Sequence, residues 1–95
     1  MFSIEDAAAA LAAAKIDISG ERFALEDVRM GMEVEMEHGT RFPDLDVTGD
    51  DPVVTAKIAL AHLREFPDYY QRLEVMEREA EAAWAIELEA DTGVV

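Results

Sequence analysis

Two histidine–glutamate pairs are the residues of this sequence whose types and spacing could do chemistry. Glu35 and His38 are three positions apart, and so are His62 and Glu65. On a helix this spacing places both side chains of a pair on one face. Carboxylates and Glu-x-x-His pairs on facing helices build the metal sites of helical bundles, and such ligands suit iron, manganese or zinc. The sequence therefore offers a four-residue metal site that could be redox-active.

A structural interpretation explains the same residues. On a helical wheel His62 lies beside Ile58 and Ala59, so its imidazole can be a core group bonded to Glu35 or to a tyrosine. His38 would then stand near the C-terminal end of its helix, where the helix dipole favours a protonated imidazole. Histidine–carboxylate pairs also perform structural roles, and the sequence leaves both interpretations open.

The segment from Asp44 to Asp50 is a second candidate site, for calcium. Oxygen-bearing residues alternate in it and are followed by glycine, as at the start of an EF-hand loop. The twelfth position is Thr55, which cannot supply the bidentate carboxylate that such a loop needs. Turn formation and helix capping explain the same residues more simply.

Nucleophilic chemistry has little support in this chain. It contains no cysteine, and its two serines, Ser3 and Ser19, fall where a helix cap and a chain break are expected. Neither a phosphate-binding glycine loop nor a dinucleotide-binding fingerprint occurs. We therefore expect a protein that is not an enzyme.

The charge of the chain restricts its partners. Its 95 residues include 22 Asp and Glu against 8 Lys and Arg, a net charge of −14. Direct nucleic-acid binding is disfavoured because it requires basic side chains to neutralise phosphates, and an anionic membrane would repel the chain. A hydrophobic content of 51% is too high for a disordered tail. The length predicts a single helical domain over residues 1–95.

The N-terminal segment bears on localisation. It lacks the basic region of a signal peptide, and the apolar stretch over residues 7–14 is too short to cross a bilayer. These features predict a cytoplasmic protein.

The elements that position the two pairs are predicted to be helices. Ser3 and Asp6 form a capping-box pattern before an alanine-rich helix that reaches about Lys15. A second helix is expected over about 24–38 and to stop at Gly39. The residues just before this glycine alternate like a strand, but an apolar stripe at helical spacing favours a helix. The stripe consists of Leu25, Val28, Met32 and Met36.

Two further helices complete an all-α fold, a small bundle of three to four helices. One is expected over about 52–65, with Pro52 at its first position. It is apolar almost all round, which predicts a central place. A longer C-terminal helix is expected over about 68–90, with Pro67 able to begin it. That helix carries an apolar stripe at heptad spacing, formed by Tyr69, Leu73, Met76, Ala80 and Ala83, with Trp84 beside it.

Three segments resemble an uncharacterised family of prokaryotic and phage proteins. They are Val-Glu-Met-Glu-His at 34–38, Asp-Asp-Pro at 50–52, and the segment 57–70, which contains His-Leu-Arg-Glu-Phe-Pro-Asp-Tyr-Tyr. The similarity covers about residues 28–73. It implies a shared fold but no activity, since the family has none assigned. It also implies shared use of Glu35, His38, His62, Glu65, Asp68 and Tyr69.

The expected function is that of a small acidic interaction module. The C-terminal helix carries many acidic side chains: Glu74, Glu77, Glu79, Glu81, Glu87 and Glu89, against Arg72 and Arg78. Such a face is either solvated, a docking surface for a basic protein partner, or a nucleic-acid mimic. The apolar stripes predict a homo-oligomer, since small chains often need a partner to bury enough surface. A metal-binding bundle is the alternative function.

Overall fold

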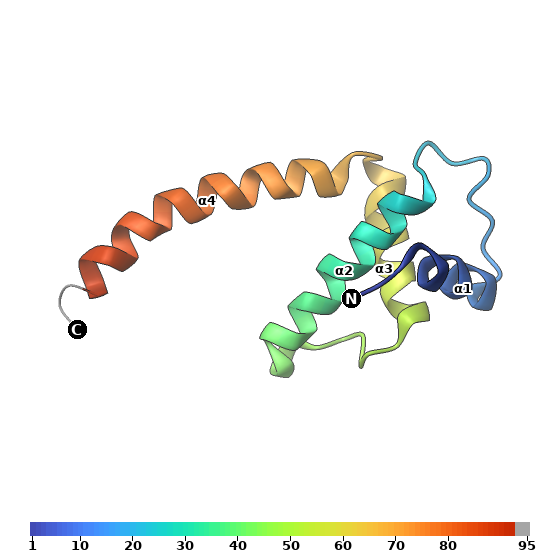
Figure 1. Ribbon diagram of the computed structural model, residues 1–95, viewed down its shortest axis with the longest axis horizontal. Coiled ribbons are helices and arrows are strands. Elements are labelled where there is room, and N and C mark those ends of the chain that lie inside the picture. Colours follow the sequence, from blue (N-terminus) through green and yellow to red (C-terminus); the bar gives the residue numbers. More distant parts are fainter. Residues whose placement is uncertain (93–95) are drawn as a thin grey trace.

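The protein is built from helices, as the sequence predicts. The computed structural model describes the backbone of residues 1–92 and the side chains of residues 1–37 and 41–84. The helices are α1 (Ile4–Ala14), α2 (Leu25–Arg41), α3 (Pro52–Glu65) and α4 (Tyr69–Thr92), with a short 3-10 helix, η1 (Pro43–Leu45), after α2. Residues 1–92 contain no strand. Figure 1 shows α1, α2 and α3 packed together and α4 leaving them.

Helix α1 begins at the predicted capping box. Ser3 Oγ accepts a hydrogen bond from the Asp6 backbone at 3.1 Å, and Asp6 Oδ2 accepts one from the Ser3 backbone at 2.9 Å. Lys15 ends the helix in the left-handed conformation, with φ of 59°. The small side chains of α1 let it approach α2 and α3 closely. It buries Ala7, Ala10 and Leu11 against them.

Helix α2 is longer than predicted, and the expected stop at Gly39 is wrong. The helix continues to Arg41. Phe42 then leaves the helix with φ of −129°, because the residue before a proline is pushed out of the helical region. Pro43, rather than the glycine, is therefore the signal that ends this helix.

Helix α3 has the predicted bounds and the predicted central place. Asp51 caps it by accepting a hydrogen bond from the Val53 backbone at 2.9 Å, and Pro52 occupies its first turn. It packs against α1, α2 and α4. Its fully buried residues include Ala56, Ala59 and Leu63, so its apolar surface forms the middle of the core.

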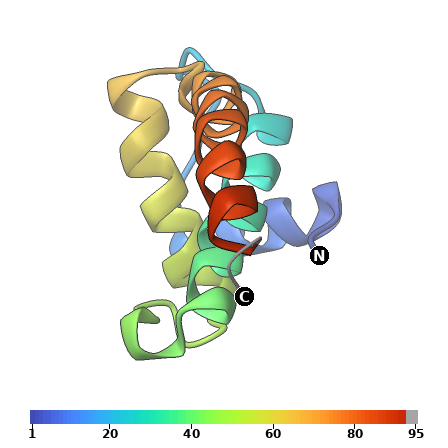
Figure 2. The same ribbon diagram turned by 90° about the vertical axis from the view of Figure 1, so that its left-hand side faces the viewer.

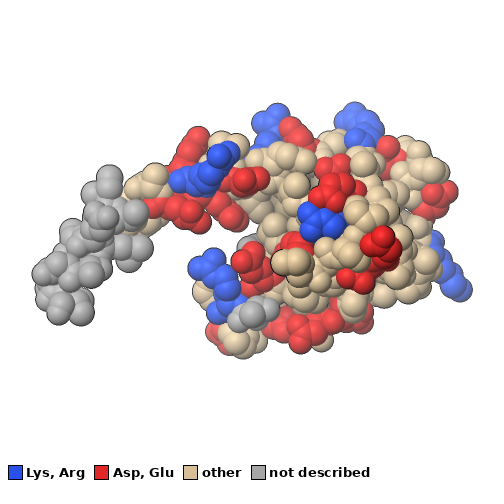
Figure 3. Space-filling model, viewed as in Figure 1, with Lys and Arg blue, Asp and Glu red and all other residues tan. Residues whose placement is uncertain are grey.

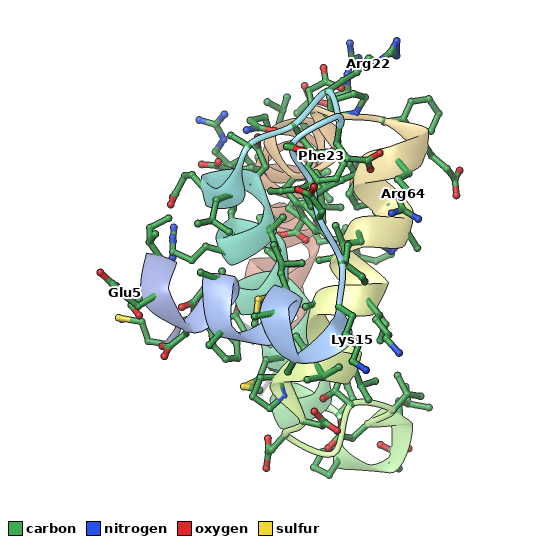
Figure 4. The ribbon with its side chains drawn as sticks, turned by 90° about the vertical axis from the view of Figure 1, so that its right-hand side faces the viewer. Glu5, Lys15, Arg22, Phe23 and Arg64 are labelled. Carbon is green, nitrogen blue, oxygen red and sulfur yellow. The ribbon has the colours of Figure 1, made fainter. Side chains whose placement is uncertain are left out.

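The connection between α1 and α2 is anchored at two points. Figure 4 shows Phe23 pointing inward among the helices while Arg22 points away, and Phe23 is only 9% exposed. Glu21 forms an ion pair with Arg64 of α3 at 2.9 Å. The buried ring of Phe23 and the ion pair of Glu21 therefore hold this segment against the bundle.

Helix α4 projects from the bundle. It starts at Tyr69, two residues later than Pro67, because residues 67 and 68 form a turn. The molecule measures 52 × 26 × 20 Å with a radius of gyration of 15.8 Å, above the roughly 12 Å of a compact chain of this length. Figures 1 and 2 show that the excess comes from α4, which extends beyond the other helices. None of the described helices combines the length and apolarity that a bilayer crossing requires.

Candidate functional site

Side chains from three helices meet at Glu35. Tyr70 Oη of α4 donates a hydrogen bond to Glu35 Oε1 at 2.9 Å. His62 Nε2 of α3 lies 3.5 Å from the same oxygen. The Glu35 side chain is 13% exposed, whereas that of His62 is 36% exposed. We call Glu35, His62 and Tyr70 the junction cluster, because it joins α2, α3 and α4.

Gly31 makes room for the junction cluster. A Cβ atom at this position would lie 2.5 Å from Cε2 of Tyr70 and 2.8 Å from the Cβ atom of Ala59. Both distances are too short for carbon atoms that do not share a bond. The absence of a side chain at Gly31 therefore lets the Tyr70 ring lie against α2, with its hydroxyl bonded to Glu35.

The orientation of His62 is fixed by aromatic contacts. Its ring stacks on Tyr69, with centroids 4.2 Å apart and planes 9° from parallel. Tyr70 meets the same imidazole edge-on, at 6.2 Å and 88°. Offset stacking and edge-to-face contacts are the favourable geometries for such rings. The consecutive tyrosines at the start of α4 thus position both the imidazole and the carboxylate.

The Tyr70 hydroxyl stays protonated at neutral pH. Burial raises the pKa of Tyr70 far above its ordinary value of 10.0, and the nearby negative charge of Glu35 and the hydrogen bond to it raise this pKa further. The phenol is therefore a permanent donor to Glu35. The cluster holds a carboxylate in place; it does not prepare tyrosine as a nucleophile.

The acidic loop after η1 is organised by Asp46. Its Oδ1 accepts hydrogen bonds from the backbone of Thr48 at 3.0 Å, the Thr48 hydroxyl at 3.1 Å and the backbone of Gly49 at 3.1 Å. The Gly49 bond, followed by those of Thr48, lowers the pKa of this carboxyl. Gly49 and Asp50 then take positive φ angles of 55° and 64°. These contacts agree with turn formation as the explanation of this loop, because Asp46 uses its carboxylate to hold the turn.

A pocket of about 370 Å³ lies beside the junction cluster. The loop after α2 forms one wall, and α2 and α3 form the others. Its lining is mostly apolar, with the Glu35 carboxylate on one side. The lining residues are Glu35, Phe42, Leu45, Asp46, Val47, Thr48 and Ile58.

Of the four predicted metal ligands, the structure brings Glu35 and His62 together. Among the side chains of residues 1–37 and 41–84, no three His, Cys, Asp or Glu are close enough to hold one ion. Glu65 is exposed on α3, and the side chain of His38 lies outside the described residues. The four-residue site therefore stays a prediction. Asp68, which the resemblance also implicated, pairs with Arg72 at 2.6 Å on the surface.

Sequence reasoning missed Tyr70 and Gly31. The two consecutive tyrosines were a usable signal, because one of two adjacent helical residues must face away from the stripe that contains Tyr69. Gly31 inside a helix was another, since a glycine there costs helix stability and often marks a close approach.

The described part of α4 presents a second surface of functional interest. Its apolar stripe starts against the core, where Tyr69 and Leu73 are partly buried, and continues onto Met76 and Trp84, which are 53% and 62% exposed. Glu74, Glu77 and Glu81 follow one edge of this stripe at helical spacing. Figure 3 shows acidic side chains around this segment and across the bundle. The side chains of Glu87 and Glu89 lie outside the described residues.

These features define a small all-α protein with a carboxylate-centred junction and a projecting acidic helix. The chain belongs to the DUF5661 family, described as a protein of unknown function, whose model matches residues 7–79. The match is wider than the resemblance over residues 28–73 and includes the whole junction cluster. It ends within α4, before Trp84. Searches of curated proteins and of solved structures found no match.

Proposed function

We propose that this protein is a cytoplasmic, non-enzymatic interaction protein that binds a basic amphipathic helix of another protein along α4. One observation carries the proposal. The apolar stripe that seats α4 on the bundle continues past Leu73 onto Met76 and Trp84, where the described chain leaves it uncovered. An exposed apolar stripe on a helix marks a binding site for another helix.

Charge complementarity favours a basic partner over a second copy. The acidic edge formed by Glu74, Glu77 and Glu81 runs beside the stripe, and each copy of the chain carries a net charge of −14. A symmetric dimer uses the same patch on both subunits, so it would bring these like charges together. A helix with lysines beside its apolar face would pair with the edge instead. The predicted homo-oligomer is the competing occupant of the same surface.

A synthetic peptide tests the proposal. A helical peptide of leucine and lysine, with a glutamate-for-lysine version as the control, would be titrated into the protein by calorimetry at low and high salt. We expect the basic peptide to bind, and its affinity to fall by about tenfold or more at high salt, because exposed charge pairs are screened. The acidic peptide should not bind.

Two variants that each add one negative charge test whether the peptide binds at the α4 stripe. Met76→Glu should abolish binding, whereas Ile4→Glu adds the same charge on α1 and should leave it unchanged. Binding that ignores both salt and Met76→Glu would reject the proposal. A concentration-dependent dimer in light scattering that is lost in Met76→Glu would identify a second copy as the occupant.

A metal-binding bundle is the second candidate function. The 3.5 Å approach of Glu35 Oε1 and His62 Nε2 from different helices favours it, since an ion needs ligands that converge. The proposed ligands are Glu35, His38, His62 and Glu65, and the proposed ions are iron, manganese or zinc. Elemental analysis of untagged protein tests it. Stoichiometric metal that is lost in His62→Ala would support the site, and substoichiometric metal unchanged in that variant would remove it.

A further inference from the structure

The pocket beside the junction cluster is independent of the α4 surface. It lies where the loop after α2 folds over the side of α2 and α3, and its volume of about 370 Å³ is within the range of small-molecule sites. It is lined by residues of α2, η1, the following loop and α3.

The walls of the pocket suit an apolar body. Phe42, Leu45 and Val47 are 47%, 68% and 76% exposed, which is unusual for large apolar side chains gathered in one short loop. Ile58 of α3 also lines the pocket. A ligand that covers these side chains would gain the free energy of removing their apolar surface from water.

The polar side of the pocket is anionic. Two carboxylates, Glu35 and Asp46, contribute to the lining. Asp46 Oδ1 already accepts the three hydrogen bonds of its own turn. Glu35 lines the pocket from a mostly buried position, where its Oε1 accepts the hydrogen bond of Tyr70 and lies 3.5 Å from His62 Nε2. A partly desolvated carboxylate attracts a cation more strongly than one in bulk water does, because less water screens it.

The field of the whole chain acts in the same direction. A net charge of −14 raises the local concentration of cations and repels anions. A neutral ligand would contact the apolar walls but would gain nothing from this field.

We propose that this pocket binds a small organic cation, with a primary ammonium group at Glu35 and an aromatic or branched aliphatic body against Phe42, Leu45, Val47 and Ile58. The ammonium donates hydrogen bonds to the carboxylate, and the apolar body closes the mouth of the pocket. The ligand class is thus an amine of roughly the size of a single substituted ring.

Three probes of one shape test the charge requirement. The amide signals of the labelled protein would be followed by NMR during titration with 2-phenylethylamine, 2-phenylethanol and phenylacetate, which are cationic, neutral and anionic at neutral pH. We expect saturable shifts at Glu35, Ile58 and residues 42–48 with the amine, affinity about tenfold lower for the alcohol, and no binding of the acid. Equal affinity for the amine and the alcohol, or no saturable shift with the amine, would overturn the proposal.

Matched variants test the assignment to Glu35. Glu35→Gln should remove the preference for the amine over the alcohol, whereas Glu37→Gln removes the same charge from an exposed position on α2 and should retain it. Leu45→Ser should lower the affinity for the amine and for the alcohol by similar factors. Circular dichroism establishes that each variant is folded, and the comparison of probes on the unmodified protein stands without any variant. A preference that survives Glu35→Gln would overturn the assignment.

Discussion

Helices α3 and α4 both carry apolar side chains at helical spacing, but the two helices lie in opposite environments. In α3 the apolar side chains at core positions are fully buried, Ala59 and Leu63 among them, because three other helices surround it. In α4 the stripe is partly buried at Tyr69 and Leu73 and then carries the exposed Met76 and Trp84. The difference shows that helical periodicity predicts which face is apolar but not whether the chain itself covers that face.

The largest expected difference in the free energy of unfolding is between alanine variants of two methionines. Met32 of α2 is fully buried, so Met32→Ala should lower the free energy of unfolding by about 2–5 kcal/mol through lost burial and a cavity. Met76→Ala should change it by less than about 0.5 kcal/mol, since this side chain is 53% exposed. Urea denaturation followed by circular dichroism measures both. A large loss in Met76→Ala would mean that α4 packs on a protein surface in solution.

A smaller effect is expected where α4 joins the bundle. Gly31→Ala places a Cβ atom 2.5 Å from the Tyr70 ring, and overpacking of this kind costs about 1–3 kcal/mol. The higher helix propensity of alanine offsets about 1 kcal/mol of that cost. Gly20→Ala is the matched control, because nothing lies within 4 Å of a Cβ atom there. Equal stabilities of the two variants in urea would contradict the tight contact between Tyr70 and α2.

The hydroxyl of Tyr70 is expected to contribute less than its ring. Tyr70→Phe removes the donor to Glu35 and should cost about 1–2 kcal/mol, whereas Tyr69→Phe keeps the stack on His62 and should cost less. The two variants would be compared by urea denaturation at neutral pH. A larger loss in Tyr69→Phe would reverse the roles assigned to the two tyrosines.

The same tyrosine predicts a dependence on pH. Because folding raises the pKa of Tyr70 above 10.0, its contribution is complete below pH 10.0, where the folded and unfolded phenols are both protonated. Above that pH the unfolded phenol ionises first, so the stability falls. This decline should be shallower in Tyr70→Phe when denaturation is repeated at alkaline pH.

The smallest expected effect lies on the projecting helix. Ala82→Gly weakens the helix locally by about 1 kcal/mol, but Ala82 is exposed and comes after Leu73, which packs against the core. The free energy of unfolding measured in urea should therefore change by less than about 0.5 kcal/mol, while the helical ellipticity at low denaturant falls. Ala59→Gly, at a fully buried site of α3, should lower the midpoint clearly. Equal losses would show that α4 and the bundle unfold as one unit.

Local signals in the sequence predicted the elements of the fold well. The capping box of Ser3 and Asp6 and the Asp51-Pro52 start of α3 depend on neighbouring residues only, and both are confirmed. The predicted end of α2 at Gly39 was wrong, because a glycine permits a helix to end but does not require it. A following proline forces the preceding residue out of the helical conformation, as Pro43 does here. These are competing local rules, and only the structure shows which one decides.

The candidate site was predictable only in part. The histidine–glutamate spacing predicted Glu35 and His62 as site residues, and the structure places Glu35 Oε1 and His62 Nε2 3.5 Å apart. Tyr70 could not be assigned from spacing, since its contact with Glu35 joins residues 35 positions apart. The pocket was equally hidden, because it depends on how the loop after α2 lies against two helices.

The position of Trp84 gives this protein a built-in optical reporter. It is the only tryptophan of the chain, and it stands 62% exposed on the helix that leaves the bundle. Its emission should resemble that of the free amino acid in water and should hardly change when the core melts. A blue shift of that emission would instead indicate that another molecule binds α4 and covers Trp84. The intrinsic fluorescence of this protein therefore monitors association rather than folding.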